Sequence, residues 1–96
     1  MKKVGQKNQE TNKTLEYIAL KPARLTKEEL RVLRCGLGCT QEDFALRIGR
    51  DLQTIGRWER GEGPADQAAE IVLRVLVLQY LKLPVPSLEE MAFWLI

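Results

Sequence analysis

Residues 40–61 read TQEDFALRIGRDLQTIGRWERG, and this stretch decides the fold of the chain. It contains two short helical patterns joined by a tight turn. Thr40 and Asp51 are suited to cap the two helices, and Gly49 is suited to the left-handed conformation that a sharp turn requires. Ala45 is small at the point where the two helices would cross closely. These spacings predict a helix-turn-helix rather than a generic helical hairpin.

The two helices have distinct inner and outer faces. Apolar side chains that are expected to form the core are Phe44, Ala45 and Ile48 in the first helix and Ile55 and Trp58 in the second. A projection of about 100° per residue places Gln53, Arg57 and Arg60 on the opposite side of the second helix. That outward face is polar and basic, as expected of a surface that contacts a negatively charged partner.

Helical patterns continue on both sides of this stretch. Residues 26–29 (TKEE) fit a capping box, and they precede a helix whose apolar positions repeat at i, i+3 and i+7: Leu30, Leu33 and Leu37. Pro64 opens a long apolar helix that is expected to run to about Tyr80. A second capping box at Ser87 starts a final helix.

The N-terminal part is expected to be extended. Residues 1–13 are polar and lysine-rich, which predicts a disordered arm. Residues 15–20 (LEYIAL) alternate and end before Pro22, which predicts a short strand or an extended arm. The expected organisation is a flexible arm over 1–23, a helix-turn-helix domain over 24–81, and a C-terminal helix over 82–96 that serves packing or dimerisation.

The charge of the chain is polarised along its length, although the net charge is only +2. Residues 1–23 carry five lysines against two glutamates, and residues 24–61 carry eight basic against six acidic side chains. Residues 62–96 carry two basic against five acidic side chains. Such a chain can turn its basic half toward phosphates and its acidic half away from them.

The composition excludes several classes of function. The chain has no histidine, so histidine-based catalysis and His-containing zinc sites are excluded, and Cys35 and Cys39 cannot supply four zinc ligands. We find no catalytic constellation and expect neither an enzyme nor a cofactor or metal site. The apolar run 71–81 is too short to span a bilayer, and residues 1–14 lack a signal-peptide core, so we expect a cytoplasmic protein.

At residues 40–61 the sequence resembles the Cro and phage-repressor (Xre-type) helix-turn-helix family. The similarity extends over about residues 25–78 and is strongest at Thr40-Gln41, Ala45 with Gly49, and Thr54-Ile55-x-Arg57-Trp58-Glu59-x-Gly61. The resemblance implies an all-α, lambda-repressor-like DNA-binding domain of about five helices with an N-terminal extended arm. Its partner would be double-stranded DNA.

The resemblance also implies roles for individual residues. Base-edge contacts fall on Leu52, Gln53, Thr54 and Arg57. Glutamine can pair with adenine and arginine with guanine, while threonine and leucine can touch thymine methyl groups. The resemblance assigns phosphate contacts to Gln41 and Arg60. We also predict a phosphate contact for Arg50. For Arg50 and Lys27 the two possibilities are a phosphate contact and an ordinary surface position. Arg34 and Glu59 match a structural ion pair of the family.

Three positions depart from the family pattern. Asp51 replaces a small polar residue, and we interpret it as a helix cap whose carboxylate faces the backbone. Gly56 replaces a more common serine, which costs about 1 kcal/mol of helix stability relative to alanine and suggests a closer approach to the duplex. Leu52 cannot donate a hydrogen bond to a base.

The long helix over 64–80 is apolar almost all round, and the helix-turn-helix can cover only one side of it. The rest requires either a second subunit or the C-terminal residues Leu88, Met91, Trp94 and Leu95. We therefore predict a homodimeric repressor or autoregulator on a palindromic operator, with a self-contained monomer as the alternative. The rival function is an antitoxin or adaptor that holds a toxin protein through residues 15–20 and the C-terminal surface.

Overall fold

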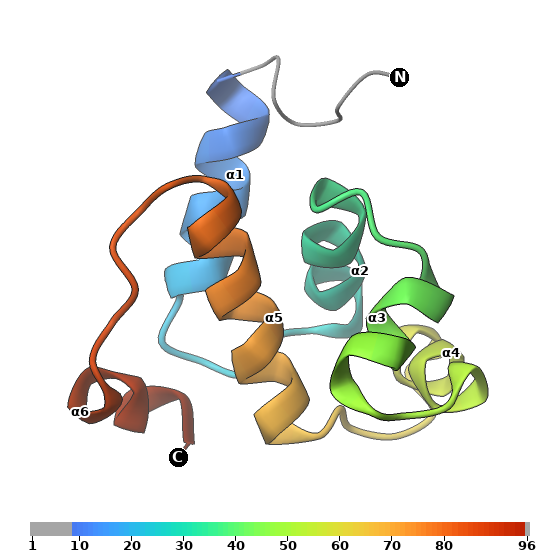
Figure 1. Ribbon diagram of the computed structural model, residues 1–96. Coiled ribbons are helices and arrows are strands. Elements are labelled where there is room, and N and C mark those ends of the chain that lie inside the picture. The colour runs from blue at the N-terminus through green and yellow to red at the C-terminus, as the bar shows by residue number, and fades with distance from the viewer. Residues whose placement is uncertain (1–8, 96) are drawn as a thin grey trace.

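The computed structural model describes residues 9–95, so the part of the predicted arm over 1–8 lies outside the described residues. Every regular element in the described range is helical, which confirms the all-α class (Figure 1). The elements are α1 (Gln9–Leu20), α2 (Lys27–Gly36), α3 (Gln41–Ile48), α4 (Leu52–Arg60), α5 (Gln67–Tyr80), α6 (Leu88–Met91) and the 3₁₀ helix η1 (Ala92–Leu95).

The helices begin where local capping signals place them. The Thr26 hydroxyl accepts a hydrogen bond from the Glu29 backbone N–H, and the Glu29 carboxylate accepts one from the Thr26 N–H. The same reciprocal arrangement starts α3 at Thr40 and α6 at Ser87. Each box satisfies backbone donors that the first turn of a helix leaves unpaired. The predicted capping boxes at 26–29 and at Ser87 are confirmed.

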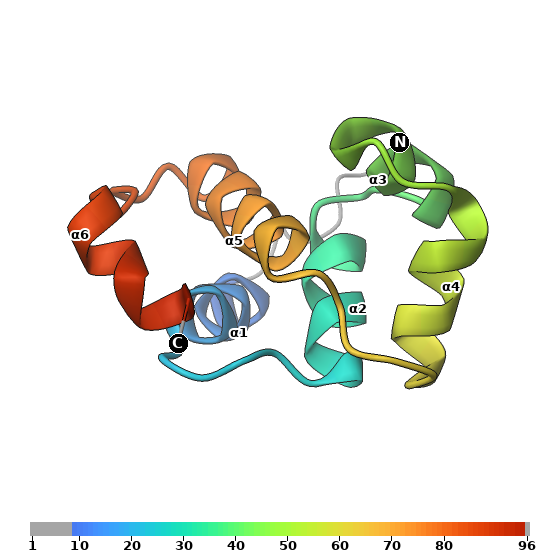
Figure 2. The same ribbon diagram turned by 90° about the horizontal axis from the view of Figure 1, so that it is seen from below.

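The prediction of a strand or extended arm over residues 15–20 is wrong, because these residues form the second half of α1, and the prediction of a disordered arm is wrong for residues 9–13, which form its first half. Leu15, Ile18 and Ala19 are buried at i, i+3 and i+4 on one helical face. Figures 1 and 2 show α1 lying alongside α5 and next to α2. A six-residue apolar segment fits either period, and burial against two neighbouring helices selects the helical one.

The rest of the core lies along the side of α5 for which the sequence analysis had identified no covering helix in the helix-turn-helix. α5 begins at Gln67, three residues later than Pro64, and Asp66 caps it. Leu73, Val77 and Leu78 on this helix are fully buried. Helix α1 covers α5 where only a second subunit or the C-terminal residues were expected, and the C-terminal residues add to this cover.

The C-terminal residues cover α5 only in part. Trp94 is buried and Met91 packs partly buried against the core. Leu88, which was expected to join them, is 83% exposed, so that expectation is wrong. Leu88 is the first residue of a four-residue helix and points to solvent before the chain turns back onto α5. The Leu95 side chain lies outside what the structure describes.

One buried arginine ties the segment between α1 and α2 to α5. The Arg74 guanidinium donates to the backbone carbonyls of Ala19 (3.2 Å), Lys21 (2.5 Å) and Ala23 (2.5 Å). It also lies 4.6 Å from the centre of the Trp94 ring. These contacts hold α1 against the helix-turn-helix, so α1 belongs to the same packed unit. Among the described helices, none has the length and apolarity needed to cross a membrane.

Candidate nucleic-acid interface

The turn between α3 and α4 is built as the sequence predicts. Gly49 has a φ of 70°, in the left-handed region, and the Arg50 N–H donates to the Ala45 carbonyl at 3.0 Å. Asp51 then caps α4: its carboxylate accepts from the backbone N–H of Thr54 (2.9 Å) and from the Thr54 hydroxyl (2.8 Å). These hydrogen bonds lower the pKa of Asp51. The interpretation of Asp51 as a cap is confirmed.

Helix α4 is anchored on one side and open on the other. Ile55 is 0% exposed, and Trp58 is partly buried against the core. Leu52 is 48% exposed, and Gln53 and Arg57 are exposed as well. Figure 2 shows α4 at the edge of the molecule, with α2 and α3 on its inner side. No part of the chain that the structure describes covers the outward face of the helix.

Three residues from three helices form a buried polar network behind this face. The Arg34 guanidinium of α2 contacts the Glu59 carboxylate of α4 through Nε (2.6 Å) and Nη2 (2.9 Å), so the pair implied by the family resemblance is present. The Gln41 amide nitrogen of α3 donates to the same carboxylate at 3.0 Å. Burial alone would raise the pKa of Glu59, but the hydrogen bonds from Arg34 and Gln41 outweigh it and lower that pKa.

The two arginines assigned to phosphates already have carboxylate partners. Arg50 forms an ion pair with Asp66, the cap of α5. Arg60 contacts Glu62 through Nε (2.8 Å) and Nη2 (3.3 Å). The sequence reasoning missed both carboxylates, although Glu62 follows Arg60 by only two residues. Any phosphate that binds here must share or displace these partners.

Gly56 lies on α4 beneath two of the residues assigned to phosphates. A Cβ atom at this position would lie 3.1 Å from Arg60 Nη1 and 3.8 Å from Gln41 Oε1. Gly56 is buried by these side chains. Gly56 thus packs against side chains of the protein itself, and its role as a point of close approach to the duplex stays a prediction.

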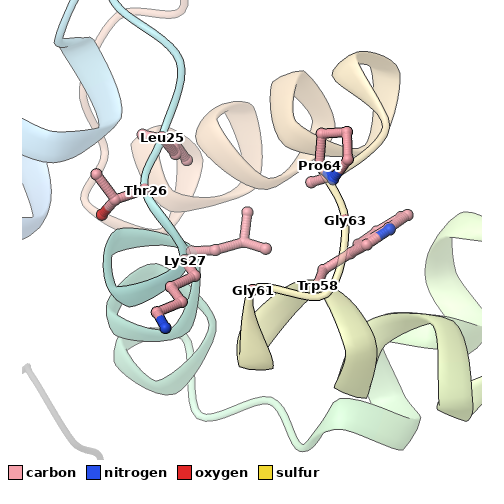
Figure 3. Close-up of a pocket in the computed structure, with 9 residues that line it drawn as sticks. Leu25, Thr26, Lys27, Trp58, Gly61, Gly63 and Pro64 are labelled. Carbon is pink, nitrogen blue, oxygen red and sulfur yellow. The ribbon is translucent and has the colours of Figure 1, made fainter.

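Trp58 lies on another side of α4 and lines an open cavity of about 410 Å³ between the start of α2 and the end of α4 (Figure 3). Pro64 and Leu25 contribute apolar walls. The Lys27 stem lies against Gly61, where α4 ends. A cation near the carbonyl end of a helix is electrostatically favourable, so a structural role explains the position of Lys27.

Neither cysteine is part of a ligand cluster. Cys35 is exposed, and Cys39 is partly buried. Among residues 9–95, no group of three or more acidic, cysteine or histidine side chains is placed to hold a metal ion.

Residues 30–76 match the profile of a family described as helix-turn-helix. The matched range holds most of α2, all of α3 and α4, and most of α5, whereas α1 and α6 lie outside it. This segment of the chain is therefore similar to helix-turn-helix domains, which supports the resemblance to the Cro and phage-repressor (Xre) type. No curated protein and no solved structure matches the chain.

Proposed function

We propose that the protein is a sequence-specific transcriptional repressor that places α4 in the major groove. Leu52, Gln53, Thr54 and Arg57 would contact base edges, and Gln41, Arg50 and Arg60 would contact phosphates. The observation that carries this proposal is the open outward face of α4, which rests on a rigid support of Ile55, Trp58 and the buried Arg34–Glu59 pair. Repression would follow from steric exclusion of the transcription machinery at the bound site.

The chemistry of the four base contacts differs. Gln53 and Arg57 can make bidentate hydrogen bonds to adenine and guanine respectively. Thr54 donates its hydroxyl hydrogen to Asp51, which leaves the Thr54 methyl group as the part suited to thymine. Leu52 is half-exposed and can offer only an apolar contact, again to a thymine methyl group. The preferred site should therefore contain at least one guanine and several A·T pairs.

We also propose that two copies bind a pseudo-palindromic operator, because α4 has only nine residues and can read only a short half-site. The inner face of α5 is not available for pairing, since α1 covers it.

The rival function is an antitoxin or adaptor that holds a toxin. One argument for it was a free apolar segment over residues 15–20, and the structure weakens that argument. Leu15, Ile18 and Ala19 are core residues, so only Tyr17 and Leu20 of the apolar residues in the 15–20 segment are exposed to a partner.

Selection of bound sequences from a pool of random duplexes tests this function directly. We expect enrichment of a two-fold symmetric motif with half-sites roughly 34 Å apart, one helical turn. The affinity for the selected site should fall steeply as salt is raised, because bound phosphates release counterions. A pool that shows no enrichment would reject sequence-specific binding, and a single unrepeated half-site would reject the dimeric arrangement alone.

A further inference from the structure

Trp58 forms part of a cavity that the proposed contacts with DNA do not use. The cavity has a volume of about 410 Å³ and lies between the start of α2 and the end of α4. Figure 3 shows Leu25 and Lys27 on one side of it and Trp58 and Pro64 on the other. Small-molecule sites in proteins typically have volumes of about 300–1,000 Å³. The cavity is therefore large enough for a small organic molecule.

Most of the cavity wall is apolar. The lining residues with apolar side chains are Leu25, Leu30, Trp58, Pro64 and Ala65. Trp58 packs against the core but is only partly buried, so part of its ring is left uncovered. Aromatic rings pack favourably on one another in offset-stacked or edge-to-face arrangements. A flat aromatic molecule is thus the shape that suits this wall.

Lys27 is the only charged residue among those that line the cavity. Within residues 9–95 its ammonium forms no ion pair with a carboxylate. Its stem lies against Gly61, where a Cβ atom would be 2.9 Å from Lys27 Cδ and 3.2 Å from Lys27 Nζ. Lys27 is exposed, and its flexible stem lets the ammonium move toward the mouth of the cavity. A negatively charged ligand would therefore be attracted to this side of the cavity, and a cation would be repelled.

We propose that this cavity, which we call the Trp58 cavity, binds a small planar aromatic carboxylate. The aromatic ring lies against Trp58 and Pro64, and the carboxylate faces the Lys27 ammonium. The bound molecule contacts α2 and the end of α4 at the same time, and it leaves the outward face of α4 uncovered. This site is additional to the proposed DNA-binding surface, and its existence does not depend on that function.

Binding can be measured on the full chain without DNA, through the NMR signal of the Trp58 indole N–H. Trp58→Phe identifies this signal, because the chain has two tryptophans and Trp94 does not line the cavity. The probes are 2-naphthoate, 2-naphthalenemethanol and the 2-naphthylmethylammonium ion, which share a ring system and differ in charge. We expect 2-naphthoate to shift the Trp58 signal with a Kd of about 0.1–1 mM, as for a ligand of this size. The alcohol should bind about two- to fivefold more weakly, since an exposed ion pair contributes modestly, and the cation should bind least.

Two substitutions test the charge and the space separately. Lys27→Met keeps an apolar stem, so it should weaken 2-naphthoate binding about two- to fivefold and leave the alcohol unaffected. Lys13→Met, at an exposed lysine of α1 outside the cavity, is the matched control. Ala65→Leu occupies the space of the ring and should weaken binding of all three probes about tenfold or more. Its control is Ala68→Leu, at an exposed alanine of α5 that does not line the cavity.

Several results would overturn the proposal. One is a Trp58 signal that 2-naphthoate does not shift, and another is 2-naphthoate binding no tighter than that of the alcohol. Unchanged binding to Ala65→Leu, in a variant shown to be folded by its melting temperature, would place the probe elsewhere. If Ala65→Leu does not fold, the comparison of Lys27→Met with Lys13→Met decides. A Trp58 signal that shifts with protein concentration in the absence of a probe would assign the cavity to a second copy of the chain instead.

Discussion

Arg74 and Glu70, one turn apart on α5, form an ion pair that is almost wholly removed from solvent. Arg74 Nη2 lies 3.1 Å from Glu70 Oε2, and the side chains are 0% and 2% exposed. Glu70 also accepts hydrogen bonds from Arg24 Nε (2.9 Å) and from the Leu25 backbone N–H (3.0 Å). Because both charges are buried, each depends on the other and on the backbone groups of the α1–α2 connection.

We expect Arg74→Met to reduce the free energy of unfolding by about 3–5 kcal/mol, since it removes one of the two arginine partners of the buried Glu70 and the donor to three backbone carbonyls. The double variant with Glu70→Gln should lose less than the sum of the single losses, because the two residues are coupled. Urea unfolding measures both quantities. Arg47→Met, at an exposed arginine of α3, is the matched control and should change the stability little. A loss for Arg74→Met no larger than that of the control would contradict the role of the pair.

Close packing of α1 on α2 depends on Gly36. A Cβ atom at Gly36 would lie 2.5 Å from Leu15 Cδ2 and 2.8 Å from Leu15 Cδ1. Gly36→Ala should therefore destabilise the fold by about 1–3 kcal/mol through overpacking, even though alanine is the better helix former. Leu15→Ala alone should cost about 2–5 kcal/mol, and the double variant should be more stable than the sum of the two losses predicts. Additive losses in thermal melts would show that the two side chains do not meet.

Base reading by Arg57 predicts a specific effect on DNA binding. Arg57→Ala should reduce the affinity for the selected operator by about 1–3 kcal/mol and relax the preference at one base pair. Arg60→Gln, at a residue assigned to a phosphate, should instead weaken binding to all sequences nearly equally and reduce the salt slope by about one. Both comparisons require operator titrations at fixed salt. An unchanged operator affinity of Arg57→Ala would reject its role.

The lowered pKa of Glu59 predicts a loss of stability in acid. A carboxylate whose pKa is lower in the folded state contributes stability above its unfolded value, here 4.5, and loses it as the pH falls through the folded-state pKa. Glu59→Gln should destabilise the protein at neutral pH by about 1.5–3 kcal/mol, the value of hydrogen bonds to a charged group. The free energy of unfolding, followed from neutral pH to about pH 3, should then fall less steeply in the variant than in the wild type. Parallel curves would exclude Glu59 as a source of the pH dependence.

Signals that act over three or four residues were readable from the sequence. The caps at Thr26, Thr40 and Asp51 and the left-handed Gly49 each depend on groups close in the chain, so the composition of each short segment specifies them. The pattern of residues 40–61 likewise predicted which face of α4 turns outward. The exposure of Gln53 and Arg57 in the structure agrees with that pattern.

Contacts between distant segments could not be read in this way. The segment over residues 15–20 fits a strand as well as a helix, and only its burial against α5 and α2 makes it helical. Leu88 has the apolar character of a core residue but lies at a helix start that faces solvent. In the sequence, Arg74 is a charged residue within an apolar run. In the structure, its guanidinium donates hydrogen bonds to backbone carbonyls of residues that lie more than fifty positions earlier in the chain.

The sequence by itself determined the helix-turn-helix, its caps and its outward basic face, because hydrogen bonds within a turn and a helical period are local properties. The tertiary structure alone decided that α1 completes the core beside α5, that Gln41 joins the Arg34–Glu59 pair, and that Arg74 binds the carbonyls of residues 19, 21 and 23. Those arrangements are contacts between residues that are far apart in the chain. They form only when the helices pack together, so the local sequence does not specify them.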